Sequence, residues 1–473
     1  MQLPKFRLGK VSNTSHTSAA SLTLRQSIYP LFLVTLLFFL WGFSYGLLDT
    51  LNKHFQNTLG ITRVRSSGLQ AAYFGAYPLA SLGHANWILR KFGFKAVFVW
   101  GLSLYGIGSL LAWPALVYRS FGGFCAAIFV IGNGLGSLET AANPYITICG
   151  PPKYSELRIN FSQAFNGVGS VVAPLMGSYI FFKDVDDDAN AIKNVQWVYL
   201  AIACFVFCLA VVFCFSDIPE ITDADMALQA QSANASNADK PLRKQYRLFH
   251  ASFAQFCYCG SQVAIAGYFI NYCVETKAGT SSSTGAQLLA GAQGAFAIGR
   301  FLGVILMKYI RPRIVFLVFF TMIIIFISPS IGVRGDAGIA MLYGTLFFES
   351  IIFPSIVALG MKGLGRHSKQ GSGFIIAGVI GGAVVPPILG AVSDIRGSNT
   401  AYAMSVPLFF FVLAWSFGWC VNFVESYRAP IDAMGVDVAV VEGPGSAVVE
   451  EILEGSDLER EKKVKGDVFA EKV

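Results

Sequence analysis

The run from Phe121 to Cys149 contains the hexapeptide Glu139-Thr-Ala-Ala-Asn-Pro144, and this stretch decides the fold class of the chain. The run is otherwise strongly apolar. A carboxylate in hydrocarbon costs on the order of a few kcal/mol even on insertion scales, so an acid inside such a run indicates a function. Asn143 follows Glu139 at i+4, which places both polar groups on one helix face. The pair predicts a substrate or ion pathway inside a bundle of membrane helices.

The composition predicts a membrane protein independently of any motif. Of the 473 residues, 54% are hydrophobic and 13% are charged, whereas soluble domains average about 25% charged. The mean hydropathy is +0.56. So little polar surface could not cover a soluble protein of this length. The net charge of +7 comes from Lys and Arg scattered between apolar runs, which favours a topology signal over nucleic-acid binding.

Twelve apolar segments have about the length needed to cross the hydrocarbon of a bilayer, so we predict an all-α, polytopic protein with twelve transmembrane helices. The first 27 residues are basic and rich in Ser and Thr without an apolar core, which is typical of a cytoplasmic tail and not of a signal peptide. The predicted spans are 27–57, 66–89, 96–117, 121–149, 158–182, 195–215, 249–274, 284–308, 313–332, 338–362, 371–394 and 401–424.

The basic residues predict the orientation. With the N-terminus inside, cytoplasmic tails and loops hold 19 Lys and Arg residues near the spans, against 9 on the opposite side. Both termini are therefore expected in the cytoplasm, in a plasma membrane. The nine cysteines fall in or at the edges of the spans, so we interpret them as small apolar fillers and predict neither disulfides nor a metal site.

The chain divides into two halves joined by a polar linker. We predict a basic tail over 1–26, six-helix halves over 27–215 and 249–424, a flexible linker over 216–248 and a disordered tail over 425–473. The tail holds 12 acidic against 6 basic residues. The halves repeat weakly, since Asn143-Pro144 aligns with Phe353-Pro354. A parallel six-plus-six repeat is typical of the major facilitator fold, whose binding site lies between the halves.

Four charged side chains lie well inside the predicted spans. Glu139 is the strongest candidate for a function, the alternative being a protonated acid that locks helices together. Asp49 lies in the outer half of the first span, where an interfacial acid is the alternative. Glu349 precedes Pro354 by one turn, and a function and a structural pairing are equally favoured there. For Arg300 we favour a structural role, either reaching the cytoplasmic surface or pairing as a gate.

Uncharged polar groups add to this set. Gln163 and Asn166 share a face of the fifth span, and Gln255 and Gln262 share a face of the seventh, with Tyr268 and Asn271 further along. A sugar needs hydrogen-bonding groups and an apolar or aromatic wall, which these spans provide. Each amide alone could equally bond two helices together. Collectively they favour a polar, uncharged substrate.

Several motifs resemble the fucose permease (L-fucose:proton symporter) branch of the major facilitators. The most specific is Gly136-Ser-Leu-Glu-Thr-Ala-Ala-Asn-Pro144, and the others lie at 38–49, 160–166 and 254–262. The resemblance implies a cavity whose two acids couple protons and bind sugar. These acids map onto Asp49 and Glu139, and the amides of the cavity map onto Gln163 and Asn166. The chain departs from the bacterial permease at 45–48, at Ala266 in place of a tryptophan, and at Glu349.

We therefore predict a proton-coupled importer of a monosaccharide such as L-fucose or a related hexose. Asp49 and Glu139 are the expected proton-coupling residues, and the expected substrate-binding residues are Asn143, Gln163, Asn166, Gln262, Tyr268 and Glu349. The expected partners are the sugar, protons and membrane lipid, without nucleic acid, a cofactor or a second subunit. An exporter of a small metabolite and a transport-inactive nutrient sensor are the alternatives. No nucleophile–base pair, metal cluster or phosphate-binding loop in the sequence indicates an enzyme.

Overall fold

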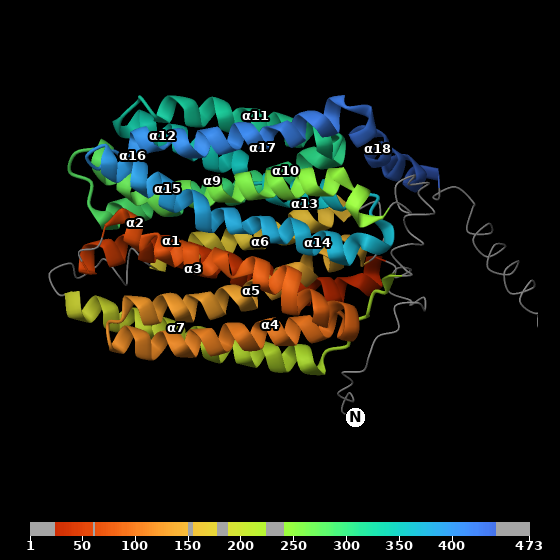
Figure 1. The fold of residues 1–473 in the computed structure, drawn as a ribbon, viewed down its shortest axis with the longest axis horizontal. Helices are drawn as coiled ribbons and strands as arrows, with labels where there is room; N and C mark the ends of the chain where they lie inside the picture. The colour runs from red at the N-terminus through yellow and green to blue at the C-terminus, as the bar shows by residue number, and fades with distance from the viewer. Residues whose placement is uncertain (1–23, 60–61, 150–154, 177–187, 224–240, 441–473) are drawn as a thin grey trace, which may run out of the picture.

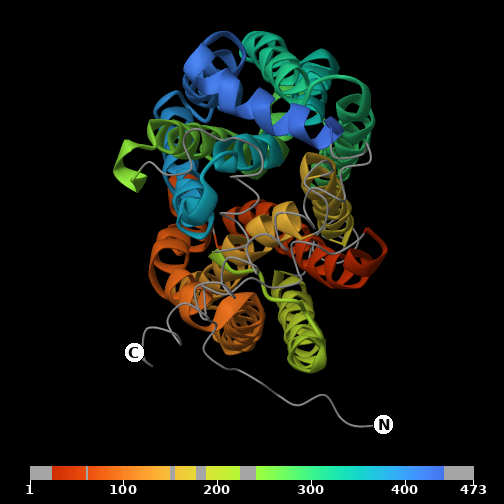
Figure 2. The same ribbon diagram turned by 90° about the vertical axis from the view of Figure 1, so that its right-hand side faces the viewer.

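The computed structural model describes residues 24–59, 62–149, 155–176, 188–223 and 241–440, and these residues form helices without a strand. The helices run roughly parallel to one another, with the N-terminal half below the C-terminal half in Figure 1. Figure 2 views the same bundle from one end and shows the two halves as separate groups of helices packed together. The predicted helical class and the two-half arrangement are both observed.

The N-terminal half begins with α1, which at 36 residues is the longest element. It extends to Leu59, as the helical spacing of apolar residues after Leu48 predicts. The other elements of this half are α2 (Arg63–Ser66), α3 (Gly68–Gly75), η2 (Leu79–His84), α4 (Ala85–Val117), α5 (Phe121–Ile148), α6 (Ser155–Met176) and α7 (Asp188–Phe215). The remainder of the predicted fifth span lies outside the described residues.

The C-terminal half repeats this sequence of helices with more interruptions. Two of its predicted spans are broken, one between α12 and α13 at 350–351 and one by the short helix η7. Its main elements are α9 (Tyr246–Thr276), α10 (Ser282–Tyr309), α11 (Pro312–Ser330), α12 (Gly335–Glu349), α13 (Ile352–Met361), α14 (Ser368–Ala377), η7 (Gly378–Ile380), α15 (Gly381–Ile395), α16 (Thr400–Ala403) and α17 (Ser405–Phe423).

Nine helical runs among the described residues are long and apolar enough to cross a membrane. One of them, Gly68–Val117, is 50 residues long and contains two predicted spans. Gly93 divides it, because its φ of +84° and ψ of −174° are not helical. The helices α6 and α9 stand at the predicted fifth and seventh spans but are not among the nine. In the described part of the chain, each of the twelve predicted spans thus overlaps a helical segment.

The turn at Gly93 depends on the start of the segment between the halves. The Glu220 carboxylate accepts hydrogen bonds from the backbone N–H groups of Phe94 (2.8 Å) and Lys95 (3.1 Å), which begin the next helix. A Cβ on residue 93 would overlap that carboxylate, so only glycine fits. Burial raises the pKa of Glu220, while the two backbone hydrogen bonds act in the opposite direction.

The flexible linker predicted over 216–248 is therefore wrong at both of its ends. Residues 216–223 pack on the N-terminal half: the Lys95 ammonium donates to the Ser216 carbonyl at 2.8 Å, and the Tyr145 hydroxyl donates to the Pro219 carbonyl at 3.1 Å. At the other end, η5 (Leu242–Lys244) leads directly into α9. The middle of the predicted linker lies outside the described residues.

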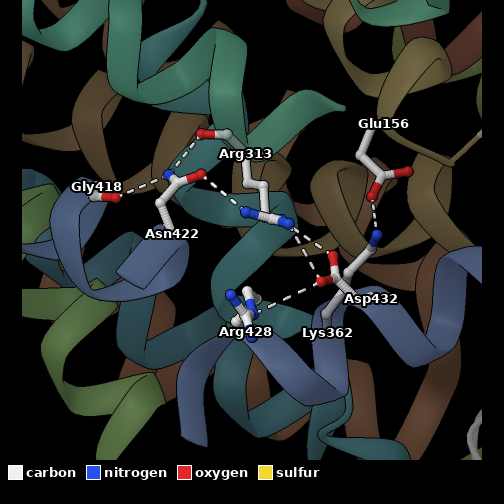
Figure 3. A network of polar contacts seen from close by, with 7 residues as sticks. All are labelled: Glu156, Arg313, Lys362, Gly418, Asn422, Arg428 and Asp432. Carbon is white, nitrogen blue, oxygen red and sulfur yellow. Dashed lines mark hydrogen bonds and ion pairs between the residues drawn. The ribbon is translucent and has the colours of Figure 1, made fainter. Parts of the chain in front are cut away.

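The prediction of disorder from residue 425 is also wrong for its first part. Residues Glu425–Val440 form the helix α18. Arg313 at the start of α11 holds it: its Nε and Nη2 donate to the two carboxylate oxygens of Asp432 at 3.0 and 3.2 Å, and its Nη1 donates to Asn422 Oδ1 at 3.1 Å (Figure 3). A bidentate arginine–carboxylate pair fixes both orientation and position. Residues 441–473 lie outside the described part.

Candidate functional site

A cavity lies between the two halves. Both halves contribute aromatic side chains, amides and small residues to its wall. The N-terminal half provides Trp41, Tyr45, Phe74, Asn166 and Ser170, and the C-terminal half provides Cys259, Gln262, Val263, Phe296, Arg300, Phe353 and Val379. A wall of apolar surface with a few placed polar groups is typical of a small-molecule site.

A second, smaller cavity adjoins the first within the N-terminal half. It is lined by Leu37, Phe38, Trp41, Leu135, Leu138, Glu139 and Ala142, so its wall is apolar apart from the Glu139 carboxyl and the Trp41 indole. Trp41 lines both cavities. Its indole N–H donates to the Tyr77 hydroxyl at 2.8 Å, and its ring centroid lies 5.3 Å from that of Phe353 in the other half. The indole therefore separates the buried acid from the larger cavity.

Glu139 is 4% exposed and shares its helix face with Asn143, as the i+4 spacing predicts. Asn143 Nδ2 donates to Glu139 Oε1 at 3.5 Å. Glu139 Oε2 has no hydrogen-bond partner among the described residues, although the Tyr77 side chain lies nearby. An ionised carboxylate in this position would lack the hydrogen bonds that a buried charge needs. The site therefore suits a carboxyl that gains and loses a proton.

The fifth and eighth spans meet across the cavity through Arg300. Its Nη1 donates to Gln163 Oε1 at 2.6 Å and also to the Gln163 carbonyl. Four residues along α6 from Asn166, about one turn further, Ser170 Oγ donates to Gln293 Oε1 at 3.2 Å. Gln163 is fully buried, so its amide holds the two halves together at this point. The predicted face of Gln163 and Asn166 is observed, with Asn166 on the cavity wall.

Arg300 does not reach the cytoplasmic surface, which was one of the two forms that its predicted structural role could take. Arg300 is 2% exposed, and its guanidinium lies 4.6 Å from the centre of the Phe296 ring, on the cavity wall. Pairing across the halves was the other possibility, and the bond to Gln163 is of that kind. The positions of Trp41, Phe353 and Gln293 at this site were not predicted from the sequence, because aromatic and amide residues are frequent in such helices for packing alone.

Tyr268 and Glu349, which were predicted to bind substrate, line neither cavity. Tyr268 is fully buried within the C-terminal half. Glu349 ends α12 and is 1% exposed; its Oε1 has no hydrogen-bond partner within the described part of the chain. The Tyr258 hydroxyl donates to the Glu349 carbonyl at 2.7 Å. Asp49 lies in α1, and its side chain is outside the described residues.

The two halves contact each other on both sides of the cavity. At one end α2 packs on α15, and at the end that carries α18 the helix α14 packs on α5 (Figure 1). Two ion pairs cross at the α18 end: Lys362 with Glu156 (Figure 3), and Lys369 Nζ with Asp223 Oδ1 at 3.2 Å. The Ser372 hydroxyl also donates to the Thr140 carbonyl at 3.1 Å. The structure thus represents a state in which the halves are closed around the cavity.

This arrangement defines a secondary transporter of the two-half type, and comparison with known proteins places the chain in a family. The sequence profile of the Major Facilitator Superfamily matches residues 31–386, more than half of the chain, so the protein belongs to that superfamily. The predicted membership of the major facilitators is thereby confirmed.

The chain is similar to named sugar transporters over most of its length. It is 33% identical over 401 residues to a glucose/galactose transporter of Brucella abortus, covering 84% of this chain and 94% of the relative. It is 31% identical over 412 residues to the L-fucose–proton symporter of Escherichia coli, covering 83% and 93%. Its fold matches the crystal structure of FucP, a Major Facilitator Superfamily transporter, in the outward conformation, with a TM-score of 0.68, 31% identity, and 83% and 98% coverage.

Proposed function

We propose that this protein is a proton-coupled symporter of a monosaccharide, with a hexose or L-fucose as its substrate. The observation that carries the proposal is the cavity between the halves, where amides and aromatic rings face a space next to a buried carboxyl. Relatives named as L-fucose–proton and glucose/galactose transporters support this class of substrate.

The sugar is bound by Asn166 and Gln262 through hydrogen bonds to its hydroxyls, while its apolar ring face packs on Trp41 and Phe353. Gln163 and Asn143 do not line this cavity, and each is hydrogen-bonded to a residue that lines a cavity. Gln163 bonds to Arg300, and Asn143 donates to Glu139. Asp49 and Glu139 carry the protons, Asp49 from the outer part of α1 and Glu139 from beside the cavity.

The orientation follows from the 19-to-9 distribution of basic residues, which puts the end that bears α18 in the cytoplasm of a plasma-membrane protein. The ion pairs Lys362–Glu156 and Lys369–Asp223 then close the cytoplasmic side. A single chain supplies both walls of the cavity, so a monomer suffices for transport. No residue of the cavity requires a cofactor for this function.

Uptake into proteoliposomes tests the proposal. Purified protein is reconstituted, and the uptake of labelled L-fucose, D-glucose and D-galactose is measured with and without an inward proton gradient. We expect at least one of the three to accumulate only with the gradient, and L-glucose, which has the same composition and the opposite hand, to be excluded. A proton ionophore should abolish accumulation. Equal uptake of all sugars, or uptake of none, would contradict the proposal.

A further inference from the structure

Arg300 is a buried cation at the contact between the halves. It belongs to α10 of the C-terminal half, and its hydrogen bonds reach Gln163 on α6 of the N-terminal half. Gly167, one turn along α6, allows α10 to approach: a Cβ there would lie 3.1 Å from Ala297 and 3.7 Å from Arg300 Cδ. The position of the guanidinium therefore depends on how closely α6 and α10 pack.

The guanidinium retains a donor that it does not use. Arg300 Nε has no hydrogen-bond partner among the described residues, and the same holds for Glu139 Oε2. Both side chains are nine-tenths or more buried, and they stand on the walls of adjoining cavities that share Trp41. An unused donor and an unused acceptor, one from each half, thus stand on the walls of two adjoining cavities on either side of Trp41.

None of the other described titratable groups that interact electrostatically with Glu139 or Arg300 is a cation that could balance a negative charge on Glu139. Those that interact electrostatically with Glu139 are Tyr73 and Tyr77 from its own half and Cys259 and Arg300 from the other. Arg300 in turn interacts with Tyr258 and Glu139. Among these groups in the described part of the chain, Arg300 is the one that can neutralise a negative charge on Glu139.

We propose that Arg300 is the countercharge that stabilises the Glu139 carboxylate after its proton has left, and that it exchanges Gln163 for Glu139 when it does so. This inference rests on the proposed proton coupling and assigns a positioning role to a residue outside the proton-carrying pair. The O–H bond of the carboxyl breaks, its electron pair stays on the oxygen, and the proton passes to water that reaches the cavity.

The physical reason is the cost of burying a charge. A carboxylate without a partner in an apolar wall is disfavoured by desolvation, and a cation within reach offsets that cost. While Glu139 is protonated, the guanidinium of Arg300 donates hydrogen bonds to Gln163. Once Glu139 is charged, the guanidinium is drawn toward it and the bond that joins α6 to α10 is weakened. Proton release would thereby loosen the contact between the halves at α6 and α10.

Infrared difference spectroscopy tests this without a sugar. The carbonyl stretch of the protonated Glu139 carboxyl is identified as the band absent from Glu139→Gln, and its intensity is followed over pH in the full-length protein. In Arg300→Gln the carboxylate loses its countercharge, so we expect the midpoint to move to higher pH by about one unit or more, since one unit corresponds to about 1.4 kcal/mol. Arg300→Lys keeps a positive charge at this position, so its midpoint should lie close to that of the wild type.

A matched control separates this role from general stability. Arg313→Gln removes an arginine that is bonded to Asp432 and Asn422 in the same half, away from both cavities, and should leave the midpoint unchanged. An unchanged midpoint in Arg300→Gln, or an equal shift in Arg313→Gln, would overturn the inference. The sugar-uptake assay decides the proposed function separately, because the infrared midpoint is measured whether or not a sugar binds.

Discussion

Lys369 of the C-terminal half pairs with Asp223 of the segment that leaves the N-terminal half, with 3.2 Å between Nζ and Oδ1. The lysine is 1% exposed, its ammonium lies 5.5 Å from the centre of the Phe94 ring, and its carbonyl accepts a hydrogen bond from Asn86 at 3.3 Å. These three contacts of one buried lysine thus reach the opposite half. This contact would have to be broken before the cavity could open toward the cytoplasm.

The first prediction concerns this contact. Asp223→Asn should increase hydrogen exchange several-fold in the parts of α5 and α14 that face each other, because a buried cation that loses a paired charge favours separation of the halves. Exchange followed by mass spectrometry measures this. Asp336→Asn is the control, since it removes the exposed pair with Lys277, which lies within the C-terminal half. Equal exchange in Asp223→Asn and the wild type would show that the ion pair does not hold the halves closed.

The second prediction concerns Asp49. Asp49→Asn should abolish accumulation of sugar driven by a proton gradient while the protein still folds and still exchanges sugar across the membrane. An amide keeps the shape of the side chain but cannot release a proton. Proteoliposome uptake and counterflow measure the two activities, with Asp336→Asn as an acid changed outside the cavities. Accumulation against a gradient by Asp49→Asn would remove it as the proton carrier.

The third prediction separates two ways in which Glu139 can act. Glu139→Gln retains a hydrogen-bonding group next to Asn143, whereas Glu139→Ala leaves that amide without its partner. The loss of a buried hydrogen bond costs about 1–3 kcal/mol, which is roughly 5- to 150-fold in affinity. We therefore expect Glu139→Ala to bind sugar more weakly than Glu139→Gln, as measured by equilibrium binding. Unaltered affinity in both variants would assign Glu139 a purely structural role.

The fourth prediction concerns Glu349, which aligns with Glu139 in the internal repeat but stands apart from both cavities. Since its Oε1 has no partner in the described residues, Glu349→Met should remove an unsatisfied buried group and raise the thermal unfolding temperature. The ranking of L-fucose, D-glucose and D-galactose should stay the same. A changed ranking in uptake would instead support the substrate-binding role predicted from the sequence.

The fifth prediction tests the turn at Gly93. Gly93→Ala should lower stability by clearly more than 1 kcal/mol, because it adds an overlap with Glu220 to the strain of a positive φ. Gly279→Ala provides the comparison, since Gly279 has a φ of +78° and a Cβ there would meet nothing within 4 Å. Thermal unfolding of both variants in detergent gives the difference. Equal losses would show that the carboxylate moves aside.

The sequence was informative where a physical constraint acts locally. Twenty apolar residues and an i+4 pair leave few alternatives in a membrane, so the spans and the shared face of Glu139 and Asn143 could be predicted. The position of Arg300 could not, because an arginine two turns from a helix end can reach either the surface or the protein interior. Only the packing of α10 against α6 decides between these.

The two incorrect segments have a similar explanation. Polar composition predicted flexibility for residues 216–223 and for α18, but each is held by a few long-range bonds. Glu220 reaches the backbone at Phe94, and Asp432 reaches Arg313. Contacts across more than a hundred residues leave no periodic trace in the sequence. Tyr268 is fully buried and lines neither cavity, and its role in substrate binding stays a prediction.

The position of Trp41 between the two halves offers a way to observe the transport cycle. Its indole belongs to one half and its aromatic neighbour Phe353 to the other, so the rings must part when the halves rock. Of the seven tryptophans, this is the one that lines the cavities in the described residues. The chain thus carries its own fluorophore at the moving boundary. With the other six changed to phenylalanine, emission from this single ring would report alternation in real time, without an attached dye.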